Sequence, residues 1–357
     1  TLVFFFLGKR ITLKERLVMQ EAMNVNSLQG LVKMIKYVLI FTFSIEGVGA
    51  VLFATQFIPE FGIVKGIYYS VFHAVSAFCN AGFDLMGNFK SITAYANNSV
   101  VILTISALIA VGGLGFYVWV EIYNSKGIKR LSLHSKVVIY STIVLIVFGA
   151  ILMFIFEMNN PGTMKGMSVK GKILSSIFAS VSPRTAGFNS IPLDKMTSAG
   201  NFLTIILMFI GGSPGSTAGG IKTTTAIVLF MTVVSVVRGR EETEIFKRRI
   251  NKEVVYKSLV ITVLGLGIVI VVTMVLSITE PSNIPFEYFL YEATSAFATV
   301  GLTLGLTTKL TIVGKIIITL TMYAGRVGPL TIMLALAKRR SGKSGTIKYP
   351  EGKILIG

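Results

Sequence analysis

Three short segments of this sequence end in a glycine whose spacing and surroundings are alike: Asn80-Ala81-Gly82, Thr185-Ala186-Gly187 and Thr299-Val300-Gly301. Each follows an apolar stretch too short to cross a membrane and precedes one long enough to do so, as in a re-entrant pore loop. Glycine permits the dihedral angles that turn successive carbonyl oxygens to one side, and such oxygens can replace the water around a monovalent cation. The predicted ion-binding filter consists of Asn80, Ala81, Gly82, Phe83, Thr185, Ala186, Gly187, Phe188, Thr299, Val300, Gly301 and Leu302.

The three glycines also indicate an internal repeat, because they lie 105 and 114 residues apart. The position one repeat length before Gly82 would fall before residue 1, so we expect a further, first repeat to precede this chain. The alternative is that these glycines only permit helix packing or surface turns.

A run of small residues interrupts the long apolar stretch of the middle repeat, from Gly211 to Gly220. Glycine and proline disfavour a helix, and unpaired backbone inside a membrane is tolerated only where it lines water or packs against protein. We expect a mobile gate below the filter, although a passive kink is the alternative. The predicted gate residues are Gly211, Gly212, Ser213, Pro214, Gly215, Ser216, Thr217, Ala218, Gly219 and Gly220, together with Arg326.

Arg326 lies in the middle of the last apolar stretch, where a charge facing lipid would cost ~2.5–3.5 kcal/mol. It must therefore face the interior. There it can repel cations or hold the carbonyls of the interrupted segment, and either action limits conduction. The alternative is a structural pair with a carboxylate such as Glu292.

The composition requires an integral membrane protein, since 53% of the 357 residues are hydrophobic, only 14% are charged and the mean hydropathy is +0.75. The formal charge of +18 would suggest nucleic acid in a soluble chain. Here the basic residues cluster between apolar stretches, which predicts cytoplasmic linkers and a cytoplasmic C-terminus but no nucleic-acid partner. The single cysteine, Cys79, excludes an internal disulfide and a cysteine-based metal site. No nucleophile with a plausible base is visible, so an enzyme is not expected.

These features predict an all-α integral membrane fold of helix, pore loop, helix units. The expected spans are residues 31–57, 99–123, 136–157, 201–237 (broken), 256–279 and 310–337, with half-helices at 68–79, 173–182 and 286–298. We divide the chain into an inner-helix end and linker at 1–30, pore-loop repeats at 31–125, 126–252 and 253–337, and a cytoplasmic tail at 338–357.

The three loops, the broken helix, the segment Gly325-Arg326-Val327-Gly328-Pro329 and the tail from Tyr349 to Gly357 together resemble the Trk/Ktr/HKT superfamily of potassium transporters. Within it the chain is most similar to the Ktr membrane subunits of the KtrB type. The resemblance implies four pore-loop repeats around one pseudo-fourfold pore, with potassium at the filter carbonyls and Arg326 as the gate arginine. It also implies a homodimer in the cell inner (plasma) membrane and a cytosolic KtrA-like ring subunit that binds ATP or ADP. This chain itself is expected to bind no cofactor, and its flux can depend on sodium.

Two other functions stay open at this point. A secondary transporter of a small solute also has discontinuous helices, but it predicts inverted repeats, whereas these repeats run parallel. A non-conducting membrane scaffold has no need of a mid-membrane arginine. Only the central glycine is common to all three loops, so we also expect weaker selectivity for potassium over sodium than in tetrameric potassium channels.

Overall fold

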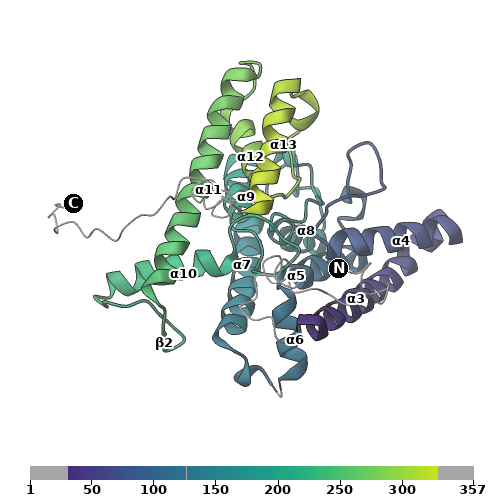
Figure 1. The fold of residues 1–357 in the computed structure, drawn as a ribbon. Helices are drawn as coiled ribbons and strands as arrows, with labels where there is room; N and C mark the ends of the chain where they lie inside the picture. Colours follow the sequence, from purple (N-terminus) through teal and green to yellow (C-terminus); the bar gives the residue numbers. More distant parts are fainter. Residues whose placement is uncertain (1–30, 126, 329–357) are drawn as a thin grey trace.

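The computed structural model describes residues 31–125 and 127–328, and this part of the chain is almost entirely helical. The expected all-α fold is thereby confirmed (Figure 1). The expected tail and the first 30 residues lie outside the described residues. The long and half-length helices are α3 (Leu31–Phe61), α4 (Ile63–Phe78), α5 (Ser99–Gly113), α6 (Phe116–Asn124), α7 (Leu133–Glu157), α8 (Val169–Val181), α9 (Ser198–Phe209), α10 (Thr223–Val237), α11 (Lys252–Thr279), α12 (Phe286–Phe297) and α13 (Ile312–Val327).

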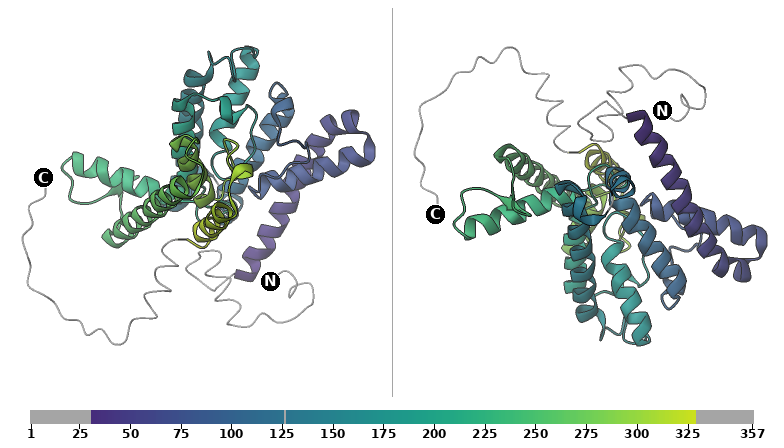
Figure 2. Two further views of the ribbon diagram at one scale, coloured as in Figure 1. Left: turned by 90° about the horizontal axis from the view of Figure 1, so that it is seen from above. Right: turned by 90° about the horizontal axis from the view of Figure 1, so that it is seen from below.

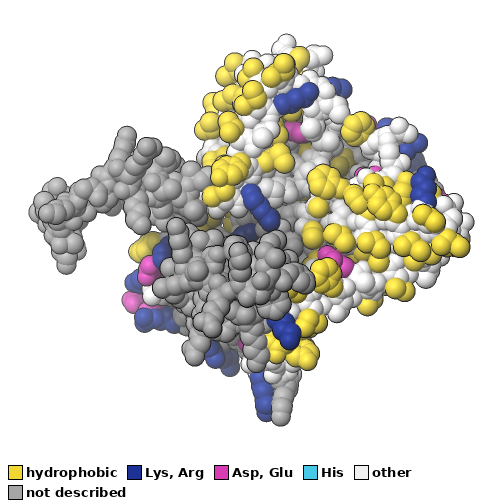
Figure 3. Space-filling view, turned by 45° about the vertical axis from the view of Figure 1, so that its right-hand side comes forward, with side chains coloured by type: hydrophobic (Ala, Val, Ile, Leu, Met, Phe, Trp, Pro, Cys, Tyr) yellow, Lys and Arg dark blue, Asp and Glu magenta, His cyan; other side chains and the backbone are white. Residues whose placement is uncertain are grey.

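Three helices of the described chain are long and apolar enough to cross a membrane: Lys36–Phe61 within α3, all of α7, and all of α11. Many of their apolar side chains project outward, as at Val51 in α3 and Ile278 in α11, which are 67% and 81% exposed. Figure 3 shows hydrophobic side chains gathered over the upper and right-hand parts of one face. Such a surface is stable against lipid, where apolar side chains need no burial in protein.

The helix pairs of the three repeats spread outward from a common centre (Figure 2). In each repeat the outer helix is followed by a half-helix, namely α4, α8 or α12, whose C-terminal end leads into one of the glycine-centred loops. The half-helices begin earlier than expected in the first two repeats, at Ile63 and Val169. Because the C-terminal end of each half-helix faces the centre, the partly negative end of its dipole also points there.

The helix expected over residues 99–123 is not continuous. It breaks between α5 and α6 with a bend of 91°. The break occurs at Gly115, whose φ of +94° is favourable only for glycine, and a Cβ at this position would collide with the carbonyl oxygen of Pro214. The backbone of another repeat approaches Gly115 closely and forces the turn.

Each repeat fastens the start of its inner helix to the end of its outer helix. In the middle repeat the carboxylate of Glu157 accepts bonds from the backbone nitrogen and hydroxyl of Thr197, the N-cap of α9, at 2.9 and 2.7 Å. In the last repeat Glu280 does the same for Thr311, the N-cap of α13, at 2.9 and 2.6 Å. In the first repeat Asn98, the N-cap of α5, donates to Gln56 at 2.9 Å. These contacts satisfy helix ends that would otherwise be unpaired.

The linker between α10 and α11 forms a small antiparallel hairpin, β1 (Glu244–Ile245) and β2 (Arg248–Arg249), in which Glu244 lies opposite Arg249. Its turn residues, Phe246 and Lys247, both have positive φ, as a two-residue hairpin turn requires. The sequence did not predict this hairpin, because its two strands have only two residues each.

Candidate ion-permeation site

The three predicted filter glycines converge. Gly82, Gly187 and Gly301 line one cavity of about 600 Å³. A Cβ built on Gly82 would collide with the carbonyl oxygen of Ala186, and one built on Gly187 with that of Val300. The second and third loops therefore each present the carbonyl before their glycine to the glycine of the preceding loop, so the three turns lie side by side rather than on separate faces.

The same backbone conformation recurs in all three loops. The filter glycines have φ of +72°, +91° and +89°, and the residues two positions earlier, Asn80, Thr185 and Thr299, are also left-handed, with φ of +51°, +78° and +53°. Positive φ is uncommon outside glycine and is retained where the surrounding structure imposes it. Alternation between left-handed and ordinary residues turns successive carbonyls to one side of the loop, which is the arrangement that cation coordination needs.

A serine in or next to each half-helix holds its loop in this conformation. Ser76 donates to the carbonyl of Phe83 at 2.7 Å, and Ser182 donates to the carbonyl of Phe188. In the third loop the direction is reversed, because Ser295 accepts from the nitrogen of Gly301 at 3.2 Å. Sequence reasoning missed these serines. The signal was their matching positions, since Ser76 and Ser295 both lie six residues before their glycines.

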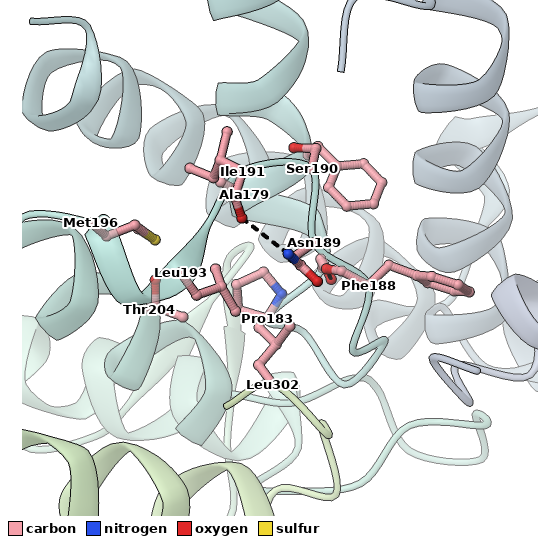
Figure 4. Close-up of a pocket in the computed structure, with 12 residues that line it drawn as sticks. Ala179, Pro183, Phe188, Asn189, Ser190, Ile191, Leu193, Met196, Thr204 and Leu302 are labelled. Carbon is pink, nitrogen blue, oxygen red and sulfur yellow. Dashed lines mark hydrogen bonds between the residues drawn. The ribbon is translucent and has the colours of Figure 1, made fainter. Parts of the chain in front are cut away.

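Side chains of the second and third loops are packed into the protein behind the carbonyls. Ala186, Phe188, Val300 and Leu302 are at most 4% exposed. Figure 4 shows the back of the second loop, where the side chain of Asn189 donates to the carbonyl of Ile191 at 3.1 Å. Leu302 of the third loop reaches the same small pocket, so the two loops support each other. In the first loop, by contrast, Phe83 is 69% exposed.

The predicted gate segment leaves the helix after α9 and lies directly against the filter loops. A parallel bridge pairs Ile210 with Ile221, so the segment leaves and rejoins the fold at nearly one point. Between them Gly219 packs so closely on the third loop that a Cβ there would collide with the hydroxyl of Thr299. On the other side, the backbone nitrogen of Ser213 donates a hydrogen bond to the carbonyl of Gly113 in α5 at 3.0 Å. The segment therefore bridges repeats in the middle of the molecule.

Thr217 is the most connected residue of this segment. Its hydroxyl accepts from the side-chain nitrogen of Asn80 at 3.0 Å and lies 3.3 Å from the carbonyl of Phe78 and 3.2 Å from that of Gly112. Its own carbonyl accepts from a guanidinium nitrogen of Arg326 at 2.7 Å. The first filter loop, α5 and α13 thus meet at one threonine.

The Arg326 guanidinium donates to a carbonyl of the interrupted segment and does not pair with a carboxylate of the described residues. The alternative partner, Glu292, accepts from the hydroxyls of Thr303, at 2.7 Å, and Thr307. A second cation, Lys222, donates to the carbonyl of Ala218 at 2.8 Å. Two neighbouring carbonyls of the segment, those of Thr217 and Ala218, are therefore each held by a positive side chain.

The cavity at the filter glycines carries charges of both signs. Asp84 and Asp194 line it, together with Lys90 and Lys309. Within residues 31–125 and 127–328, no group of three or more histidine, cysteine, aspartate or glutamate side chains could hold a metal ion. The carbonyl oxygens of Ala186 and Val300 lie close to Gly82 and Gly187, and backbone carbonyls suit an alkali cation.

Comparison with known proteins agrees with this architecture. The family model for TrkH, described as cation transport protein, matches residues 4–346. The chain is 43% identical to the potassium/sodium uptake protein NtpJ of Enterococcus hirae, over 100% of the chain and 79% of that protein. It is 40% identical to the Ktr system potassium uptake protein B of Bacillus subtilis, over 100% of the chain and 78% of that protein.

Among solved structures, the potassium transporter TrkH from Vibrio parahaemolyticus has the same fold, with a TM-score of 0.72 at 17% identity over 90% of this chain and 68% of that one. The site and the fold together define an integral membrane protein with converging pore loops. The chain belongs to the TrkH family of cation transport proteins, which confirms the resemblance drawn from the sequence.

Proposed function

We propose that this chain is the potassium-translocating membrane subunit of a Ktr-type potassium uptake system. The observation that carries the proposal is the convergence of Gly82, Gly187 and Gly301 on one cavity, each in the same left-handed turn. Carbonyl oxygens beside these glycines would replace part of the ion's hydration shell, and the half-helix dipoles favour a positive ion there. The names of the relatives, which include potassium and sodium uptake, support this substrate class and a dependence of flux on sodium.

The ring of loops is open beside Gly301, because no atom of the described chain lies within 4 Å of the position that a Cβ would take there. We propose that a further turn occupies this sector in the assembled pore and completes a fourfold set of carbonyls. The proposed working unit is a homodimer in the plasma membrane. A cytosolic KtrA-like ring that binds ATP or ADP is its proposed regulator, supported by relatives that are named as parts of a Ktr system.

The proposed gate is the segment from Gly211 to Gly220. It lies against the filter loops and is held by Arg326 and Lys222 through its own carbonyls. A segment with these small residues can change conformation at low cost, and two positive side chains beside it oppose the passage of a cation. Release of the segment by the cytosolic partner would open the path.

The experiment is uptake of radioactive rubidium by liposomes that contain the purified protein, with potassium, sodium and an amino acid as unlabelled competitors. We expect uptake that potassium competes for strongly, sodium weakly and the amino acid not at all. Competition by the amino acid would support a secondary transporter instead. Absence of uptake both with and without the cytosolic partner would support a scaffold.

A further inference from the structure

Arg184 belongs to the second filter loop, three residues before Gly187, and its side chain is buried, with 6% of its surface exposed. One guanidinium nitrogen lies 3.5 Å from the hydroxyl of Thr142 in α7, and Nε has no hydrogen-bond partner. Thr142 is ~14 Å along the axis from Leu133, the first residue of α7, so the charge lies at membrane depth. Sequence reasoning did not single out this arginine.

No carboxylate neutralises this charge among the residues that the structure describes. The ion pairs found there are Arg240 with Glu244, Arg249 with Glu242 and Lys257 with Glu253, all in or next to the basic linker between α10 and α11. An unpaired charge inside a membrane protein is costly and, where it is kept, marks an ion pathway or another functional site. Arg184 is already inside such a site by its position in the loop.

The other two filter loops have neutral residues at the corresponding position, Cys79 and Ala298, three residues before their glycines. In those loops no charged side chain at this position offsets the negative end of the half-helix dipole. In the second loop Arg184 follows the end of α8, where a positive charge offsets that dipole. Two of the three half-helices therefore direct a partial negative charge toward the cavity, which attracts cations. At the third half-helix, α8, the charge of Arg184 neutralises or reverses this partial charge.

We propose that Arg184 discriminates against divalent cations in the permeation path; this inference rests on the proposed function. A fixed positive charge repels an ion in proportion to the ion's own charge. The chain between Arg184 and Gly187 keeps their Cα atoms within roughly 11 Å. The charge lies at the end of the side chain, beside Thr142 of α7, so its distance from an ion near Gly187 is roughly 11 Å or more. At an effective dielectric constant near 20, the charge lowers the affinity for a monovalent ion by up to about tenfold, and for a divalent ion by the square of that factor, up to about a hundredfold.

The test compares the purified full chain with its Arg184→Met and Arg184→Lys variants in liposomes. Rubidium uptake gives the apparent affinity for a monovalent ion, and inhibition of that uptake by barium gives the affinity for a divalent ion. In Arg184→Met we expect the rubidium affinity to rise by up to about tenfold and the barium affinity by the square of that factor, up to about a hundredfold. Arg184→Lys, which keeps the charge but not the guanidinium geometry, should retain the wild-type ratio of the two affinities.

Arg238→Met is the matched control, because Arg238 is an exposed arginine at the end of α10 and should change neither affinity. Thr142→Asp is a second variant that keeps Arg184 but places a carboxylate beside it, and it should shift both affinities in the same direction as Arg184→Met. It keeps the test valid if Arg184→Met does not fold.

Equal shifts for rubidium and barium, or no shift in either variant, would overturn the role of Arg184, since a merely structural residue has no reason to shift the barium affinity by the square of the rubidium factor. Failure of the wild-type protein to take up rubidium would instead count against the proposed function. The two failures are thus separable.

Discussion

At the residue scale, we expect the Arg326 guanidinium to be the contact that most directly limits opening of the proposed gate. Its bond to the carbonyl of Thr217 joins α13 to the interrupted segment across 109 residues of sequence. A hydrogen bond to a charged group contributes about 1.5–3 kcal/mol, and the solvent accessibility of Arg326 places it at the low end of that range. The bond therefore favours the observed position of the segment by a factor on the order of ten.

Arg326→Gln should accordingly raise the initial rate of rubidium uptake in liposomes, on the order of tenfold at most. Glutamine keeps hydrogen-bonding capacity but removes the charge and shortens the reach to Thr217. Lys315→Gln, on an exposed face of α13, is the control and should leave the rate unchanged. An unaltered rate in Arg326→Gln would show that this arginine is structural.

Thr217 offers a separate test, because its hydroxyl and its carbonyl serve different neighbours. Thr217→Val keeps the volume and the carbonyl bonded to Arg326 but leaves the side-chain nitrogen of Asn80 without its partner. We expect a loss of about 1–3 kcal/mol in stability and a higher uptake rate, since the first filter loop is no longer tied to the gate. Thermal unfolding and rubidium uptake measure the two effects. Thr319→Val, whose hydroxyl bonds only within α13, should change neither.

At the scale of elements, the contacts between Glu157 and Thr197 and between Glu280 and Thr311 join the end of an outer helix to the start of an inner helix. Glu157 is fully buried and accepts four bonds, two from Thr197 and one each from Asn160 and Thr163. Glu157→Gln replaces one acceptor oxygen with a donor that faces other donors, so we expect a loss of about 1–3 kcal/mol. Thermal unfolding in detergent measures it. Glu253→Gln, in an exposed pair with Lys257, should cost far less, and an equal loss in both would contradict the role of Glu157.

The sequence predicted the elements well where the signal was local. The length of apolar stretches and the run from Gly211 to Gly220 gave the long helices, the half-helices and the broken helix. The break at Gly115 was not predictable, because its cause is the carbonyl of Pro214, which lies 99 residues further along the chain. The same holds for Arg184: its burial depends on how the second loop packs against α7, and a position after a half-helix does not reveal it.

At the scale of the whole molecule, the three filter loops form a directional series. Gly82 meets the carbonyl of Ala186 in the next loop, Gly187 meets that of Val300, and Gly301 has open space. A substitution by alanine at any of these glycines places a side chain at positive φ, which costs roughly 1–2 kcal/mol. Only at Gly82 and Gly187 does the added Cβ also collide with a neighbouring loop in the described chain, so the consequences of one chemical change should differ among the three repeats.

We therefore expect Gly82→Ala and Gly187→Ala to lower thermal stability more than Gly301→Ala, by about 1–3 kcal/mol beyond the shared dihedral cost. The measurement is thermal unfolding of the purified chain, with Gly267→Ala as a control, since Gly267 lies in α11 with open space around it. An equal loss at all three filter glycines would contradict the directional series for the described residues. It would mean that Gly301 also faces backbone supplied from outside them. The proposed fourth turn would occupy that same sector. Binding of a chain segment there should therefore make Gly301→Ala as destabilising as the other two substitutions, while the stability losses of Gly82→Ala and Gly187→Ala stay the same.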